Sequence, residues 1–390
     1  MRKEQEASKA HLAPLSQILP PATIGIIGGG QLGRMMAISA RQMGYKIATL
    51  EPTKNSPLAQ IADFEINASY DDEVALKKLL EMSDVVTYEF ENIPAKTIER
   101  LALHGNLPQG HRPLEITQNR SREKNAIREA GFRTAAFRDV ASVEDFEKAY
   151  AAIGAPCLLK TVSGGYDGKG QWLIKSDADL MGPRQAVASK KPFVLERFVP
   201  FQMEISVIVT RGINGDVQAF PAIENVHQNQ ILHLSTCPAK IDDALAERAE
   251  KLAKSLIEKL DFVGTLAIEM FVVGDDLIIN ELAPRPHNSG HLTLDAFNVS
   301  QFEQHIRAVC GLPLIKPELL KPAVMVNLLG QHLDYTLVAW QTPEFSQGKL
   351  HLYGKKEMKR DRKIGHLTFL GDDMKKLDMR VSKFVEPFSN

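Results

Sequence analysis

The chain has 390 residues, enough for two or three domains, which excludes a peptide or a single small binding module. Apolar residues make up 44% and charged residues 24%, as in a globular protein rather than a disordered or coiled-coil one. The 47 basic and 48 acidic side chains leave a formal charge of -1, so no global field attracts nucleic acid or anionic membrane. We expect neither as a partner.

The cysteines and the first residues indicate the cellular compartment. Cys157, Cys237 and Cys310 lie far apart with no CxxC motif, so neither a disulfide framework nor a zinc ribbon is predicted. A reducing cytoplasm fits this pattern. Residues 1–22 are charged and rich in proline, and we expect a flexible leader rather than a secretory signal. No apolar stretch approaches the ~18–20 residues that span a bilayer.

The first predicted domain covers residues 23–115. An apolar run over 23–27 predicts a strand, residues 28–33 a glycine turn, and the following segment a helix. Further strands are expected over 46–50 and 84–88. Strands that alternate with helices predict a parallel, doubly wound α/β domain.

Gly28, Gly30 and Gly33 form a GxGxxG motif between this strand and helix. Such a turn lets backbone N–H groups approach a phosphate. Glu51 ends the second strand, where a dinucleotide-binding fold places its ribose-binding acid. The motif therefore leaves three alternatives open: an NAD site, another phosphate site, or a tight structural turn.

The rest of the chain has an α+β pattern. A helix is predicted over 121–130, a boundary near 115, and a long helix over 243–260. We expect a two-lobed domain over 116–312, divided into 116–195 and 196–312. Residues 313–390 form a small C-terminal domain with strands over 323–328 and 365–370.

A second glycine-rich loop covers residues 163–170, between predicted strands over 157–160 and 171–174. Lys160 stands just before it. A strand, a flexible flap and a strand with a lysine at the base can place backbone amides and a cation over nucleotide phosphates. The spacing is not that of a Walker loop, and a plain surface hairpin is the alternative.

Two glutamates are predicted to oppose each other on a hairpin. Apolar runs over 266–273 and 277–282 are separated by residues 274–276, and a three-residue turn pairs residues whose numbers sum to 550. Glu269 and Glu281 then lie side by side. Opposed carboxylates repel unless a cation lies between them, and oxygen ligands of this kind suit Mg²⁺. A one-residue slip would remove the argument.

Residues 283–291, APRPHNSGH, follow the second glutamate with a dense set of polar side chains. Prolines keep the segment out of a helix. An arginine, two histidines, an amide and a hydroxyl favour a site for an oxyanion or a polar substrate. Lys355 and Arg362 lie in a basic run for which a solvated surface is the simpler interpretation.

These motifs together resemble the ATP-grasp enzymes of purine biosynthesis, and most closely the N5-carboxyaminoimidazole ribonucleotide synthetase family. The likeness runs from about residue 23 to about residue 370. It is carried by GGGQLGRM, YEFEN, KTVSGGYDGKGQW, ENVHQ, INELAPRPHNSGH and YGK with RKIGH. The resemblance implies an N-terminal pre-ATP-grasp domain, a two-lobed ATP-grasp region and a small C-terminal domain.

The resemblance also implies a MgATP site, in which Mn²⁺ can replace Mg²⁺. Arg120 and Lys160 would contact phosphates, residues 196–199 would form the adenine-binding hinge, and Glu204 would accept the ribose hydroxyls. Glu269 and Glu281 match the metal ligands. The nucleotide site as a whole comprises Arg120, Lys160, Gly164, Gly165, Tyr166, Asp167, Gly168, Lys169, Gly170, Glu196, Arg197, Phe198, Val199, Glu204, His227, Asn280 and Glu281.

The same resemblance implies a site for aminoimidazole ribonucleotide, with the first glycine loop on its 5′-phosphate. Arg285 and His287, with Lys160, would be the catalytic residues where bicarbonate and the amine meet. The substrate-binding set comprises Gly30, Gln31, Leu32, Glu89, Glu91, Tyr166, Asp167, Lys169, Arg285, His287, Asn288, Ser289, Gly290, Lys355 and Arg362.

The implied reaction is phosphorylation of bicarbonate by ATP to carboxyphosphate, which then carboxylates the ribonucleotide amine. Charge neutralisation and alignment are what phosphoryl transfer needs. Alternatives are another ATP-grasp ligase, such as a formate-using transformylase or a biotin carboxylase, and an NAD-dependent oxidoreductase. Gln31 and the PRPHNSGH segment favour the aminoimidazole enzyme. Relatives of this kind are commonly cytoplasmic homodimers.

Overall fold

The computed structural model describes residues 17–104, 106–165, 169–189 and 191–389. Tyr166, Asp167 and Gly168, expected in the second glycine loop, lie outside these ranges. Among the described residues, no helix combines the length and apolar character needed to cross a bilayer.

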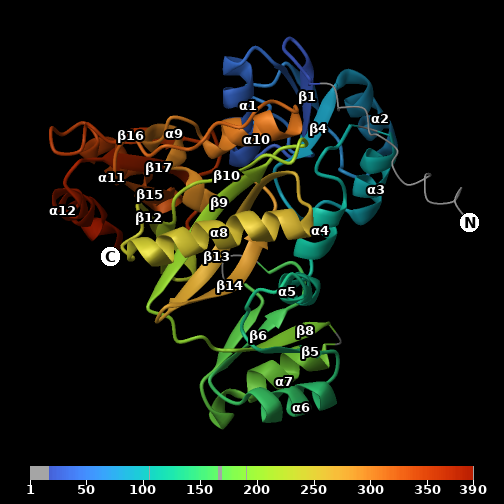
Figure 1. The fold of residues 1–390 in the computed structure, drawn as a ribbon, viewed down its shortest axis with the longest axis vertical. Helices are drawn as coiled ribbons and strands as arrows, with labels where there is room; N and C mark the ends of the chain where they lie inside the picture. The colour runs from blue at the N-terminus through green and yellow to red at the C-terminus, as the bar shows by residue number, and fades with distance from the viewer. Residues whose placement is uncertain (1–16, 105, 166–168, 190, 390) are drawn as a thin grey trace, which may run out of the picture.

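The N-terminal region is a four-stranded parallel sheet, ordered β3-β2-β1-β4. Helices cover its faces (Figure 1), so its strands read as apolar runs without alternation. The predicted strands over 23–27 and 46–50 are confirmed without change, and the third begins one residue late. The elements are β1 (Thr23–Ile27), α1 (Gln31–Gln42), β2 (Lys46–Leu50), β3 (Phe64–Ile66), α2 (Glu73–Met82), β4 (Val85–Tyr88), α3 (Ala95–His104) and α4 (Arg112–Thr117).

A second, antiparallel sheet of four strands forms the small lobe at the bottom of Figure 1, ordered β5-β8-β6-β7. Its core packs against two helices around Phe146, Leu159 and Leu195, all fully buried. The elements are α5 (Arg120–Glu129), β5 (Phe137–Val140), α6 (Val143–Ile153), β6 (Cys157–Thr161), β7 (Gln171–Ile174), η1 (Asp177–Asp179), α7 (Met181–Ala188) and β8 (Phe193–Arg197).

The largest unit is a nine-stranded sheet, ordered β14-β13-β9-β11-β12-β15-β17-β16, with β10 beside β9. The long helix α8 crosses it (Figure 1) and buries Ala249, Ala253 and Ile257 against it. Its first elements are β9 (Met203–Arg211), β10 (Val217–Ala219), β11 (Ile223–Gln228), β12 (Ile231–Cys237), α8 (Asp243–Leu260), β13 (Gly264–Val273), β14 (Asp276–Ala283), η2 (Asn288–Gly290), α9 (Thr293–Ala296) and α10 (Gln301–Val309).

The C-terminal region extends this same sheet instead of forming a separate one. β12 pairs with β15, whose partner on the other side is β17. The sheet therefore continues across the domain boundary expected at residue 313, because the edge strand β12 has backbone groups that β15 can pair. The elements are β15 (Ala323–Leu329), η3 (Gly330–His332), α11 (Leu333–Ala339), β16 (Lys349–Leu352), β17 (Lys363–Leu370), α12 (Met374–Val385) and η4 (Glu386–Ser389).

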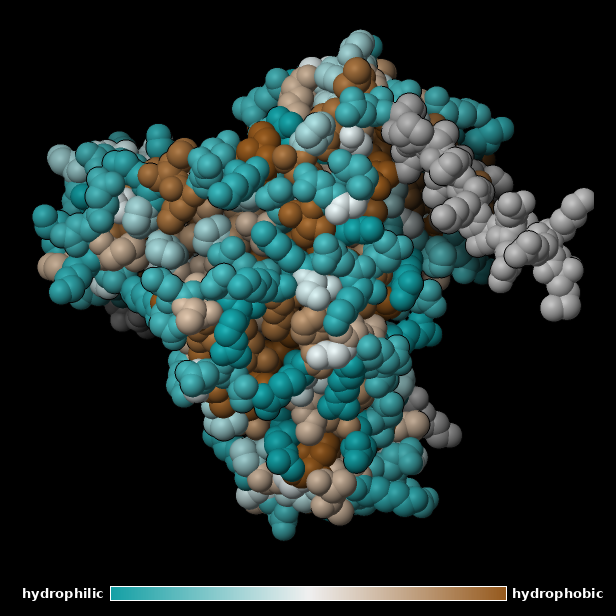
Figure 2. Space-filling view, in the orientation of Figure 1, coloured by the Kyte–Doolittle hydropathy of each residue, from teal (hydrophilic) through white to brown (hydrophobic). Residues whose placement is uncertain are grey.

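One core joins the N-terminal, central and C-terminal regions. Phe302 and Ile306 of α10 pack with Met36 of α1, and Tyr353, which follows β16, belongs to the same cluster. The surface in Figure 2 is largely hydrophilic, with its broadest apolar area below α8. Segments of α1, of α10 and after β16, which are far apart in the sequence, therefore share this one core.

Candidate active site

Glu269 and Glu281 are directly paired on β13 and β14, as the hairpin count predicts. The turn is shorter than expected, since Val273 pairs with Asp276. A bulge between Glu269 and Met270 then shifts the register by one residue. The two departures cancel, so the predicted pair is confirmed although the predicted three-residue turn is wrong.

This carboxylate pair lies in a partly buried, acidic environment. Burial, together with the charge of Glu281, raises the pKa of Glu269 to about 8. The same two causes raise the pKa of Glu123, on α5, to about 8. Arg120 Nη1 lies 3.1 Å from Glu281 Oε2. Arg120 is one positive charge beside several carboxylates, so it does not balance their negative charge. The residues present thus fit a divalent cation, which would lie between the opposed carboxylates.

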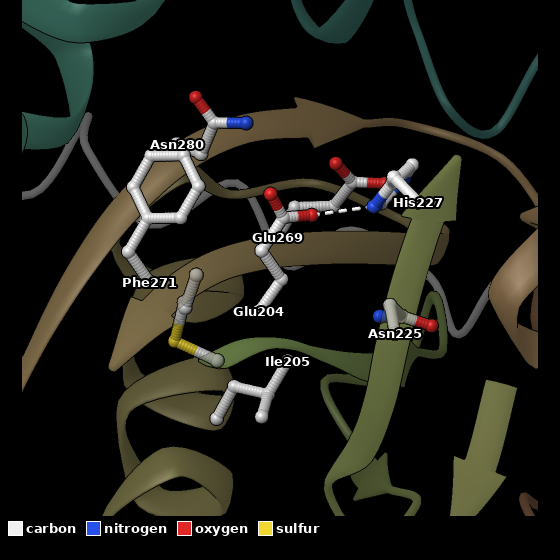
Figure 3. A pocket seen from close by; sticks show the side chains of 8 residues that line it. Glu204, Ile205, Asn225, His227, Glu269, Phe271 and Asn280 are labelled. Carbon is white, nitrogen blue, oxygen red and sulfur yellow. Dashed lines mark ion pairs between the residues drawn. The ribbon is translucent and has the colours of Figure 1, made fainter. Parts of the chain in front are cut away.

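A pocket beside the pair joins residues expected to bind the nucleotide (Figure 3). His227 Nδ1 lies 2.5 Å from Glu204 Oε2. Burial opposes a proton on His227, but Glu204 outweighs it and raises the pKa of the imidazole. Glu269 and Asn280 line the same pocket, with Glu269 beside His227. The structure therefore brings three of the predicted nucleotide residues together with one predicted metal ligand.

Lys160 reaches a buried carboxylate on the neighbouring strand. Its Nζ lies 3.0 Å from Glu196 Oε2, and Lys124 Nζ lies 3.2 Å from the same oxygen. Burial works against the charge of Glu196, but the two ammonium groups outweigh it and lower its pKa to about 2. Glu196 Oε1 is buried and has no hydrogen-bond partner among the described residues. The charge of Glu196 thus positions Lys160.

Lys124 is the main site residue that the sequence reasoning missed. It is 1% exposed and also donates to the carbonyl of Asn280. The spacing in the sequence could have indicated Lys124, because residues 120, 123 and 124 share one face of a helix. Arg120, Glu123 and Lys124 all reach β14 or β8 from this face.

The described part of the second glycine loop lies beside Arg120. Gly164 and Gly170 have φ of 74° and 75°, which favours glycine, and a Cβ on Gly165 would lie 3.8 Å from Arg120 Nη2. Lys169 is exposed. The described ends of the loop therefore lie beside the phosphate-binding residue expected there.

In the expected adenine-binding hinge, residues 196–199, two backbone amides are already bonded within the chain. Arg197 N–H donates to the carbonyl of Ala136, and Phe198 N–H to that of Pro156. The carbonyl of Val199 accepts from Phe201. Adenine recognition here would have to use other backbone groups of the segment.

In the first glycine loop, a carboxylate occupies the position expected for a phosphate. Glu89 Oε1 accepts from Gly30 N–H, and its Oε2 lies 2.7 Å from Gly33 N. A Cβ on Gly28 would lie 2.3 Å from Glu89 Cγ. Burial raises the pKa of Glu89 against these two amide bonds. Gln31 and Leu32 begin α1 beside the loop, in which the amides of Gly30 and Gly33 are bonded to Glu89.

Arg285 is held by Glu91 rather than directed outward. Its Nε and Nη2 atoms lie 2.5 and 3.1 Å from the two carboxylate oxygens, and Nη1 donates to the carbonyl of Pro286. Burial disfavours the charge on Glu91, but Arg285 outweighs it and lowers that pKa to about 2. The ion pair joins the segment after β4 to the segment after β14.

A chain of hydrogen bonds fixes the proton on His287. Ser206 Oγ lies 2.8 Å from Ser289 Oγ, which lies 3.0 Å from His287 Nδ1. Ser206 accepts from Asn225, so its own proton goes to Ser289, and that of Ser289 to Nδ1. His287 Nε2 therefore carries the proton and lies 3.3 Å from Glu269 Oε1. Burial, followed by the charge of Arg285, lowers the pKa of His287 to about 3.

The remainder of this segment is held from behind by Gln301, which the sequence did not single out. Its amide bonds both backbone groups of His287 at 2.8 and 2.7 Å. A Cβ on Gly290 would meet Gln301 Oε1 at 2.6 Å, so glycine is required there. Asn288 Nδ2 is buried, and no residue in the described part of the chain accepts from it, so it is a donor that a ligand could satisfy.

Lys355 and Arg362 are the two candidate site residues of the C-terminal region, and Lys355 lies nearer the N-terminal domain. Its Nζ is 5.9 Å from the centre of the buried Tyr353 ring, and Gln60 of the N-terminal domain donates to the carbonyl of Gly354. Arg362 is half-exposed and pairs with Glu357 at 3.7 Å.

Family models match three parts of the chain. A ribonucleotide synthetase pre-ATP-grasp domain matches residues 21–118, an ATP-grasp domain residues 125–302, and a phosphoribosylaminoimidazole carboxylase C-terminal domain residues 323–380. The predicted fold class is thereby confirmed.

Whole-chain relatives agree. The N5-carboxyaminoimidazole ribonucleotide synthase of Bacillus subtilis is 51% identical over 355 residues, 90% of this chain and 92% of that protein. A solved ADP complex of an N5-carboxyaminoimidazole ribonucleotide synthetase is 51% identical, with a TM-score of 0.92 over 95% of this chain and 98% of that chain.

An N5-carboxyaminoimidazole synthase from Aspergillus clavatus was solved with ADP and 5-aminoimidazole ribonucleotide. It is 29% identical to this chain, with a TM-score of 0.87 over 94% of this chain and 98% of that one. The chain therefore belongs to the N5-carboxyaminoimidazole ribonucleotide synthase family, which are ATP-dependent ligases of the ATP-grasp type.

Proposed function

We propose that this chain carboxylates 5-aminoimidazole ribonucleotide with bicarbonate, converting ATP to ADP and phosphate through carboxyphosphate, in purine biosynthesis. Family membership supports the reaction, and the directly paired Glu269 and Glu281 are the observation that carries it. Phosphoryl transfer depends on neutralising and aligning charged groups, and this site concentrates both signs of charge.

Mg²⁺ is the cation proposed for Glu269 and Glu281, and Mn²⁺ would suit the same oxygen donors. When bound, it would neutralise phosphate charge during transfer. His287 Nε2–H, 3.3 Å from Glu269, orients one ligand carboxylate. His287 is therefore proposed as a positioning residue, because its proton is already directed at Glu269.

The nucleotide residues have separate proposed roles. Lys160 and Arg120 bind ATP phosphates, and residues 164–170 exclude water from a labile carboxyphosphate. Glu204, Asn280 and His227 line the pocket for the nucleoside. Residues 196–199 border the base.

The ribonucleotide is proposed to bind where the N-terminal, central and C-terminal regions meet. Arg285 offers its remaining Nη1 and Nη2 N–H groups to bicarbonate or carboxyphosphate, while Glu91 holds the plane of the guanidinium. Glu89 must share or release the amides of Gly30 and Gly33 for a 5′-phosphate to reach them. The other proposed contacts are Gln31, Leu32, Lys169, Asn288, Ser289, Gly290, Lys355 and Arg362.

ADP release from ATP and Mg²⁺ with bicarbonate, measured with and without the ribonucleotide, tests the function. Strong stimulation by the ribonucleotide and an acid-labile carboxylated product are expected. ATP binding without stimulation would overturn the substrate assignment while leaving the ATP-grasp fold. A cytoplasmic homodimer is also proposed, on the family resemblance and the three free cysteines; light scattering of the purified protein tests the dimer.

A further inference from the structure

A cluster of two histidines and one aspartate lies outside the site described above. His351 on β16 and His366 on β17 are directly opposed across antiparallel strands, and their rings stack with centroids 4.5 Å apart at 13°. Asp295, on α9, approaches from the central region, with Oδ2 2.9 Å from His351 Nε2. One ligand atom from each residue lies within 4.8 Å of the other two.

The buried member of this cluster has an unused nitrogen. His366 is 0% exposed, and its Nε2 has no hydrogen-bond partner among the described residues. Its Nδ1 lies 2.9 Å from Tyr353 Oη, which lies 3.0 Å from His291 Nδ1. A phenol carries one proton, so Tyr353 donates to one imidazole and accepts from the other.

When His366 Nδ1–H donates to Tyr353, the Nε2 lone pair of His366 is bare. A buried lone pair without a partner destabilises the fold, and a cation would relieve that cost. Metal-bound histidines commonly donate their other N–H to a neighbouring acceptor, as His366 can to Tyr353. Burial lowers the pKa of both His291 and His366, so these rings stay neutral and able to ligate.

We propose that Asp295, His351 and His366 form a second cation site, selective for Zn²⁺ or a similar transition metal, that joins α9 to the C-terminal strands. Two imidazoles and a carboxylate suit such ions better than Mg²⁺. Zn–N bonds of about 2.0–2.1 Å place ligand atoms ~3.4 Å apart, so one imidazole must turn out of the stacked pair before both lone pairs point at one ion. The exposed edge of His351 leaves a fourth position to water.

Titration of the full chain with Zn²⁺, in excess Mg²⁺ to occupy the carboxylate pair, tests the site. One equivalent of Zn²⁺ is expected to bind with micromolar affinity or tighter, and to raise the melting temperature. Co²⁺ is expected to give a visible d–d spectrum that Zn²⁺ abolishes. Each of His366→Gln and Asp295→Asn is expected to lose this equivalent, the spectrum and the thermal shift.

Two further variants sharpen the test. Tyr353→Phe removes the second-shell hydrogen bond and is expected to weaken Zn²⁺ about 10- to 100-fold. His111→Gln removes an exposed histidine far from the cluster in the fold and should change nothing. Asp295 is partly exposed, so its variant keeps the test valid if His366→Gln fails to fold. Binding that survives both ligand variants, or no micromolar binding by the parent chain, overturns the proposal.

Discussion

Glu91 and Arg285 are 194 residues apart in the chain and form a two-point ion pair at 2.5 and 3.1 Å. Glu91→Gln keeps the shape but removes the charge, so the guanidinium loses its fixed plane. We expect the KM for bicarbonate to rise about 10- to 100-fold, with an unchanged KM for ATP. Asp276→Asn, which breaks the exposed pair with Arg133, is the control. Equal rises in both KM values would contradict the prediction.

Arg285→Lys tests the guanidinium itself. Lysine keeps the charge but cannot form two parallel hydrogen bonds to Glu91 while a third N–H meets an oxyanion. Carboxylation is expected to fall at least about tenfold, measured as product formed at saturating ATP. Kinetics identical to those of the parent chain would refute the anion-binding role.

Glu281→Gln removes one of the paired carboxylates without changing its size. Turnover is expected to fall at least about 100-fold, because charge on the transferred phosphoryl group is no longer neutralised. The melting temperature in the absence of metal is expected to hold or rise, since repulsion with Glu269 is relieved. ADP release and thermal melting are measured together, with Asp275→Asn in the hairpin turn as control; near-normal turnover would remove the metal assignment.

Lys124→Met leaves Glu196 with one cation instead of two. Breaking a buried ion pair on one side costs about 3–5 kcal/mol of unfolding free energy, and Lys160 is expected to be drawn closer to Glu196, raising the KM for ATP. Urea unfolding and ATP kinetics measure the two effects. Lys148→Met removes an exposed partner of Glu144 and should cost less than about 0.5 kcal/mol. Equal costs for both variants would mean that Glu196 does not depend on Lys124.

The lowered pKa of Glu196 also predicts how the free energy of unfolding changes in acid. Its folded pKa of about 2 lies below the unfolded value of 4.5, so its contribution is present above pH 4.5 and is lost as the pH falls toward 2. Glu196→Gln has no such group to protonate, and its melting temperature should fall less steeply over this window. Glu144→Gln, at an exposed carboxylate, should keep the parent slope. Parallel slopes for the parent chain and Glu196→Gln would contradict the assignment.

Local patterns predict much of this fold from the sequence. β1, β2, β7 and α8 begin and end at the predicted residues, because buried apolar runs and clear caps define them. The Glu269–Glu281 pair follows from hairpin counting, yet only because a bulge compensates for the shorter turn. A bulge depends on the partner strand β9, which a single hairpin cannot reveal.

The features that sequence reasoning missed are long-range. Nothing near Lys124 indicates that Glu196 will receive it, and nothing near Gly30 indicates that Glu89 will reach its amide. Both contacts depend on how separate elements pack. The union of β12 with β15 is of the same kind, since β15 is predicted to within one residue but its neighbour β12 is not.

The unbroken ladder from β14 to β16 has a mechanical consequence. A hydrogen-bonded sheet resists bending between its strands, and α10 on α1 fastens the N-terminal region to it. The sheet β5-β8-β6-β7 is a separate ladder, which meets this frame where Thr134 bridges Ile279 and where Gln171 of β7 donates to Gln230; nearby, Gln202 N–H donates to the carbonyl of Val272. We therefore expect closure over a nucleotide to be a swing of the small lobe alone, against a stationary frame on which the second substrate is proposed to bind.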